Sequence, residues 1–347
     1  MGVAHFAKQQ IKQVSMTVSR IKQKLQNFFQ PKLPAVACEI TRQFISVVRL
    51  NSKTPPEIDR FAVESIPHGL VNPSLTRPII TSASDLMNAL KSTFAKAEIK
   101  TSKISLAIPD ACAKVTIHHF DSLPGNENER IQLLKWRLKK TVPFNVDDSQ
   151  LSYLVQKTEG KYVIVTANIY KEVLVQLEGF FDSLGIQVGY ITLASFAAFE
   201  LLARLDVDVL QKSVLFLRVR PSDVSALIVQ QGAMVFFRHV DYESDEDSTP
   251  AEDSAATTKS GFTEIYNEIH PCLMYYQDKL GARGIEKIYI SPFRPLDPGL
   301  LSSISEKAKT PVLSLDPLRL FQWRQSGSLA NVKNVLAPTL GLALGRS

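Results

Sequence analysis

The feature that most constrains the fold is a pattern that occurs twice, in which three apolar strands follow one another with short turns between them. In the first copy, residues 35–50 predict two strands around a tight turn, and residues 58–66 predict a third. In the second copy, strands are expected at 214–219, 225–230 and 234–240. The two copies share a pattern and not residue identities, which indicates a duplicated domain. Helical periodicity elsewhere in the chain makes the fold class α/β.

The composition is that of a globular protein with more than one domain. The chain has 347 residues, 45% of them apolar and 21% charged, and this length predicts two or three domains. The formal charge of +6 is modest but unevenly spread. The first 36 residues carry basic and no acidic side chains, whereas residues 243–253 carry only acidic ones. No stretch reaches the roughly 18 apolar residues that a membrane-spanning helix needs.

The cysteines are three in number and far apart in the sequence. Cys38, Cys112 and Cys272 suggest neither a disulfide framework nor a zinc-ligand pair. They are expected to be small buried side chains in a protein of a reducing compartment.

Residues 1–34 are predicted to form a basic amphipathic helix and a linker. Apolar side chains recur there at alternating spacings of three and four, up to Phe28, and Pro31 and Pro34 end the helix. Three roles remain open. Residues 1–30 could lie on an anionic membrane surface, pair with another helix, or pack on their own domain.

The remaining chain divides into two predicted domains. The first covers 35–205 and includes an insert at about 68–170, and the second covers 206–347. The acidic run 242–260 is expected to be a disordered loop, because it cannot bury apolar area. A helix is expected over 262–280, broken or kinked at Pro271.

Five short segments, in this order along the chain, carry a family resemblance. They are Ile66-Pro67-His68-Gly69-Leu70-Val71, Ile104-Ser105-Leu106-Ala107-Ile108-Pro109, Lys135-Trp136-Arg137 followed by Val142-Pro143-Phe144, Gly232 to Val240 with Arg238, and Leu336-Ala337-Pro338-Thr339-Leu340-Gly341-Leu342-Ala343-Leu344. With them, residues 35–347 resemble the type IV pilus assembly protein PilM, an actin-like ATPase family related to the cell-division protein FtsA. The resemblance implies an actin-like (ribonuclease H-like duplicated) two-domain fold with a small inserted α+β subdomain.

The resemblance also implies a site for ATP and Mg²⁺ between the two domains, and this sequence departs from the family there. The positions in question are Glu39, Thr41 and Ser46 in the first hairpin, Arg218 and Arg220 in the second, and Ser291 in the adenosine-side turn. Where the family has Asp and Gly, this chain has larger or basic side chains, and Pro292 and Phe293 follow Ser291. Loss of glycine removes close backbone approach to phosphate. We therefore expect a degenerate nucleotide site with no catalytic residue, no metal site and no cofactor.

An active ATPase remains the alternative. In that case Glu39 would hold the metal, Thr41 would donate its hydroxyl, and Arg218 or Arg220 would pair with phosphates directly. Calorimetric titration with Mg-ATP distinguishes the two hypotheses.

The resemblance further implies a partner, the cytoplasmic tail of an inner-membrane PilN-like protein. The tail is expected in the groove between the first core subdomain and its insert, near Trp136, Arg137, Pro143 and Phe144. The chain would then be a scaffold at the cytoplasmic face of the inner membrane. No nucleic-acid motif accompanies the basic residues, so no nucleic-acid partner is expected.

Overall fold

The computed structural model describes residues 33–51, 53–158, 161–242, 256–280, 284–323 and 332–345, so the predicted N-terminal helix lies outside the described residues.

Two five-stranded sheets have the same order, β3-β2-β1-β4-β8 and β11-β10-β9-β12-β13. Each begins as an antiparallel meander and continues with parallel strands. The strands of the first sheet are β1 (Val36–Ile40), β2 (Phe44–Asn51), β3 (Glu57–Ser65), β4 (Lys103–Ile108) and β8 (Gln187–Leu193). Those of the second are β9 (Ser213–Val219), β10 (Asp223–Gln230), β11 (Ala233–Asp241), β12 (Lys287–Pro292) and β13 (Val312–Ser314). The predicted duplication is confirmed.

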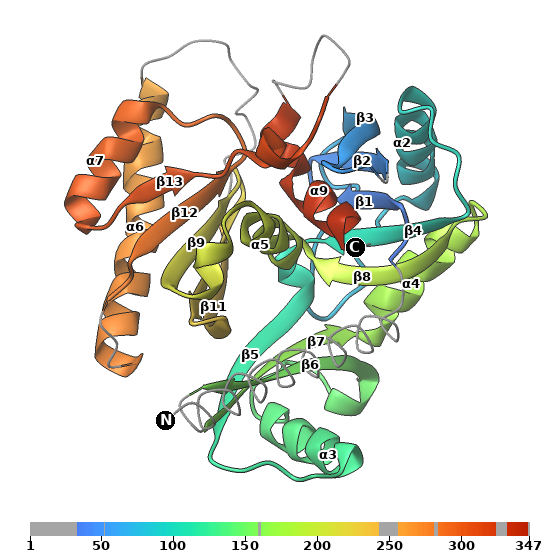
Figure 1. Ribbon diagram of the computed structural model, residues 1–347. Coiled ribbons are helices and arrows are strands. Elements are labelled where there is room, and N and C mark those ends of the chain that lie inside the picture. The colour runs from blue at the N-terminus through green and yellow to red at the C-terminus, as the bar shows by residue number, and fades with distance from the viewer. Residues whose placement is uncertain are drawn as a thin grey trace, which may run out of the picture.

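Helices cover both faces of both sheets. The first sheet is covered on one face by α2 (Ala83–Lys96) and α4 (Lys171–Asp182), and the second by α6 (Ala256–Leu280) and α7 (Pro298–Ala308). Between the two sheets lie α5 (Ala194–Leu205) and α9 (Ala337–Leu344), whose side chains form one core with both (Figure 1). Ala37 packs into this middle core and Cys38 into the outer one. Strands buried on both faces explain why β1 is a continuous apolar run apart from Glu39.

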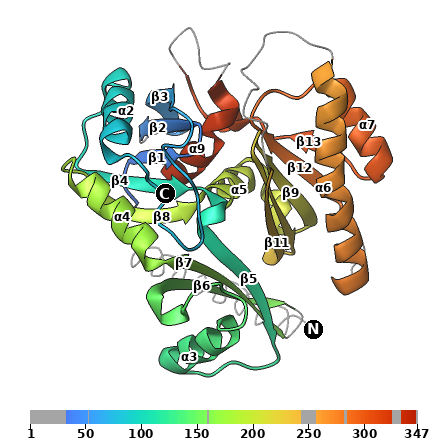
Figure 2. The same ribbon diagram turned by 180° about the vertical axis from the view of Figure 1, so that it is seen from behind.

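A third sheet, of order β5-β7-β6, forms the insert. Its strands are β5 (Ala113–Phe120), β6 (Ser149–Thr158) and β7 (Lys161–Tyr170), and α3 (Glu127–Leu138) packs on it (Figure 2). The insert sheet therefore begins at Ala113, not near residue 68. The expected range of 68–170 was too wide, because α2 and β4 pack into the first sheet.

The remaining short elements are 3₁₀ turns, named η1 (Asp110–Cys112), η2 (Val146–Asp148), η3 (Val207–Leu210), η4 (Pro317–Leu320) and η5 (Lys333–Leu336). Helix α6 begins at Ala256, so the expectation of disorder through residue 260 was wrong for its last five residues; 243–255 lie outside the described residues. The same helix continues through Pro271 instead of breaking there.

All three cysteines are buried, as predicted. Within the described ranges no helix is long and apolar enough to span a membrane.

Candidate functional site

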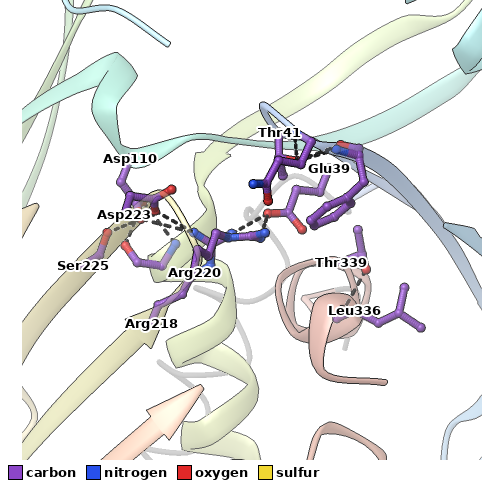
Figure 3. Close-up of polar contacts among 12 residues, drawn as sticks. Glu39, Thr41, Asp110, Arg218, Arg220, Asp223, Ser225, Leu336 and Thr339 are labelled. Atoms are coloured by element: carbon purple, nitrogen blue, oxygen red, sulfur yellow. Dashed lines mark hydrogen bonds and ion pairs between the residues drawn. The ribbon is translucent and has the colours of Figure 1, made fainter. Parts of the chain in front are cut away.

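The candidate nucleotide site lies where the β1–β2 turn of the first domain faces the end of β9 in the second (Figure 3). Glu39, near the end of β1, is fully buried. Its Oε1 accepts hydrogen bonds from Nη2 of Arg218 and Nη2 of Arg220, each at 2.6 Å. A buried carboxylate needs a partner of opposite charge, and here both partners come from the second domain. The position expected to face a metal is thus engaged by two guanidinium groups.

The two arginines are themselves enclosed. Arg218 Nη1 lies 3.7 Å from Asp110 Oδ2 and 4.0 Å from Asp223 Oδ1. The guanidinium of Arg220 lies 4.9 Å from the centre of the Phe44 ring, in a cation–π contact. Burial, and then the neighbouring charge of Arg218, lower the pKa of Arg220 to about 10. Arg220 therefore stays charged at neutral pH.

Thr41 closes the first hairpin turn on itself. Its hydroxyl donates to the Phe44 carbonyl at 2.8 Å and accepts from the N–H groups of Gln43 and Phe44 at 3.2 and 2.9 Å. In a phosphate-binding turn such N–H groups point at the ligand. Here a side chain of the turn already occupies them.

The two remaining predicted positions lie beside this cluster. Ser46 is directly opposite Glu39 in the β1–β2 register and fully buried. Ser291 is opposite Arg218 in the β9–β12 register. After Ser291 the sequence has Pro292 and Phe293 where the family has a glycine turn, and in the structure β12 continues to Pro292. The ring of Phe293 lies 6.0 Å from the ring of Phe44, centre to centre. The structure thus brings all six predicted residues together.

Sequence reasoning missed Asp110, a second buried carboxylate of the site. Asp110 begins η1, with only Pro109 between it and the end of β4, and is 1% exposed. It accepts from the N–H and hydroxyl of Ser195 at 3.1 and 2.8 Å, and from the hydroxyl of Ser225 at 2.6 Å. Its place at the carboxyl end of a parallel strand, where α/β proteins bind ligands, was the available signal.

A chain of polar contacts continues from Ser225 to the surface. Because the Ser225 hydroxyl donates to Asp110, it accepts from Nδ1 of His239, at 2.9 Å. His239 Nε2 lies 3.5 Å from Asp241, which also accepts from Arg42 at 2.9 Å. Burial opposes the charge of His239, but the contact with Asp241 and the charges of the nearby Asp110 and Asp223 outweigh it, so the pKa of His239 is raised. The neighbouring His239 side chain lowers the pKa of Asp241.

These residues do not fit a bound Mg²⁺ and triphosphate. A small pocket opens beside the cluster, and its lining includes Arg42, Arg218, Arg220 and His239 together with Asp223 and Asp241. Across the domains, Arg42 pairs with Asp241, and Arg218 and Arg220 pair with Glu39. A cation at Glu39 would meet two guanidinium groups, and phosphate would find the turn N–H groups of Gln43 and Phe44 occupied. In the described part of the chain, no cluster of His, Cys, Asp and Glu could hold a metal ion.

The predicted partner-binding residues lie on and beside α3. Trp136 is 61% exposed, and the Arg137 guanidinium lies 5.9 Å from the Trp136 ring and 5.3 Å from the Phe120 ring. Phe144 is half-buried and lies 5.7 Å from Tyr170, which precedes α4. Pro143 is exposed. Trp136 and Arg137 are thus at the surface of the insert, while Phe144 lies nearer to the junction with the first domain.

Comparisons with known proteins agree with this architecture. No protein-family model matches the chain, and no curated protein matches it in sequence. A chain of the PilM–PilN type IV pilus biogenesis complex superposes with a TM-score of 0.75 at 15% identity, covering 91% of this chain and 100% of that one. The cytoplasmic domain of EpsL, an inner-membrane component of the type II secretion system of Vibrio cholerae, gives a TM-score of 0.47 at 11% identity. The superposition covers 89% of this chain and 94% of that domain. A protein of actin-like ATPase fold from Bacteroides thetaiotaomicron gives a TM-score of 0.43 at 11% identity, with 88% of this chain and 95% of that chain covered. The chain therefore has the actin-like α/β fold that its resemblance to PilM predicted.

Proposed function

We propose that this chain is a scaffold of a type IV pilus or related secretion machine, and that it does not hydrolyse ATP. The observation that carries this proposal is the buried ion-pair cluster of Glu39 with Arg218 and Arg220. It joins the two domains where an actin-like ATPase would hold its metal and phosphates. Thr41, which satisfies the N–H groups of its own turn, supports the same conclusion.

The fold supports the assignment to a pilus or secretion machine. PilM is found in a complex with PilN, and this chain covers the whole of the matched chain. We infer that the partner here is the cytoplasmic tail of a PilN-like inner-membrane protein, which places the scaffold at the cytoplasmic face of that membrane. Trp136 and Arg137 offer an exposed aromatic and cationic pair of the kind enriched in interface hot spots. Membrane contact through residues 1–30 remains a prediction.

Titration of the purified full chain with Mg-ATP is expected to give no heat beyond dilution, because the groups that would bind metal and phosphate are paired with one another. An actin-like ATPase with intact Asp and Gly hairpins, titrated in the same buffer, is the positive control. Saturable heat that disappears when Mg²⁺ is left out would favour the active ATPase instead.

A peptide with the sequence of the PilN-like tail is expected to bind the full chain, and Trp136→Ala is expected to weaken binding at least about tenfold. Val175→Ala, an equally exposed apolar position on α4, is the control and should leave the affinity unchanged. Fluorescence anisotropy of the labelled peptide measures both. A peptide that does not bind the wild-type chain would contradict the proposed partner. Equal binding to the wild type and to Trp136→Ala would show that the peptide binds a surface that does not include Trp136.

A further inference from the structure

The insert sheet ends in an open strand. In the order β5-β7-β6, β6 pairs with β7 along ten residues, and no other described strand pairs with its outer side. Figure 1 shows the insert sheet below the two main sheets, with β6 at its edge. The far end of β6 is held in place from the second domain, because Gln156 accepts from the N–H of Met234 at 3.1 Å. This end of the edge strand is therefore anchored to the second domain.

This edge lacks the features that keep exposed strands from pairing with other chains. Natural edge strands are short, or carry charges, prolines or bulges. Strand β6 has ten residues, and its sequence Ser-Gln-Leu-Ser-Tyr-Leu-Val-Gln-Lys-Thr contains one charge and no proline. Its pairing with β7 has no register shift. Leu154 and Val155, on opposite faces of the strand, are 58% and 38% exposed. An edge of this kind is suited to pairing with another strand.

The charges at its two ends indicate which strand fits. Asp148 directly precedes β6 and Lys157 lies near its end, and both are exposed. The neighbouring Asp147 is already paired with Lys135 at 2.8 Å, so Asp148 carries the available negative charge. A second β6 in antiparallel orientation would bring the Lys157 end of each copy beside the Asp148 end of the other. A parallel copy would place like charges together, which is unfavourable. The edge is thus complementary to itself.

We propose that two copies of this chain pair through antiparallel β6 strands, which joins the two insert sheets into one six-stranded sheet. The two-fold axis stands perpendicular to the sheet, near Ser152 and Tyr153, as closed symmetry with a self-complementary patch requires. Leu154 and Val155 then lie close to the axis and are covered by the second copy. A single pair of edge strands buries little area, so the dimer is weak and concentration-dependent.

Charge reversal tests the pairing. In sedimentation velocity from micromolar to near-millimolar concentration, the wild-type full chain is expected to shift from monomer to dimer. Lys157→Glu and Asp148→Lys should each weaken the dimer by several-fold, because each places like charges at both ends of the interface. The double variant Asp148→Lys with Lys157→Glu restores opposite charges and should recover most of the dimer. A wild-type chain that stays monomeric, or a double variant as weak as the single ones, overturns the proposal.

Cross-linking identifies the strand independently of the charge variants. The natural cysteines are all buried, so Ser152→Cys adds an exposed thiol close to the proposed axis. Mild oxidation is expected to give a disulfide-linked dimer. Glu178→Cys, exposed on α4, is the control and should give no disulfide-linked dimer. Equal cross-linking of the two variants would show that the dimer, if present, does not use β6.

Discussion

Glu39→Gln is expected to lower the free energy of unfolding by about 3–5 kcal/mol, the usual cost of removing one partner of a buried ion pair. The substitution keeps the shape of the side chain and removes its charge. Arg218 and Arg220, whose side chains are 4% and 8% exposed, would then lose the carboxylate that both contact at 2.6 Å. Asp110 and Asp223 lie farther from Arg218, at 3.7 and 4.0 Å, and compensate only in part. Urea unfolding followed by circular dichroism measures the change.

The matched control is Glu200→Gln, which removes a carboxylate of the same kind from an exposed pair. Glu200 accepts from Arg204 at 3.1 Å on α5, and its side chain is half-exposed. Exposed pairs contribute at most about 1 kcal/mol. If the two substitutions cost the same, the cluster at Glu39 does not hold the domains together, and the ion pairs there would not exclude a nucleotide.

Most of the fold could be predicted from the sequence because its signals are local. The apolar runs of β1 and β2, the meander from β9 to β11 and the apolar stripe of α2 are each contained in a few residues. The limits of the insert could not be found in this way. Whether β4 belongs to the insert or to the first sheet depends on its pairing with β1, which joins Ala37 to Ser105 across the sequence.

The site shows the same division between local and distant signals. The loss of Asp and Gly from the two hairpins can be read from the sequence, and so can the basic character of Arg218 and Arg220. These arginines pair with Glu39 and not with phosphates. That pairing cannot be read from the sequence, because Arg218 lies 179 positions and Arg220 lies 181 positions from Glu39. Asp110 was missed for the same reason, since its partner Ser225 lies 115 positions away and on the other domain.

Gly341→Ala is expected to destabilise the protein by about 3 kcal/mol or more, at the upper end of the cost of overpacking. Gly341 lies in α9 within the Ala-Pro-x-Leu-Gly-Leu-Ala segment, where α9 crosses α5. A Cβ at this position would lie 1.9 Å from the carbonyl oxygen of Ala197 and 2.9 Å from its carbon. Backbone atoms cannot turn aside as a side chain can, so the two helices would have to separate.

Separation of these helices is costly because they fill the space between the two main sheets. The core around α5 and α9 includes Val48 from the first sheet and Phe216 from the second, so any shift there opens the contact between the domains. Gly179→Ala is the matched control, since Gly179 lies within α4 and an added Cβ would meet nothing within 4 Å. Alanine is the better helix former, so this change should stabilise the protein by about 0.5–1 kcal/mol. The two Gly→Ala substitutions should therefore have opposite signs in urea unfolding, and a stable Gly341→Ala protein would mean that α5 and α9 do not cross this closely.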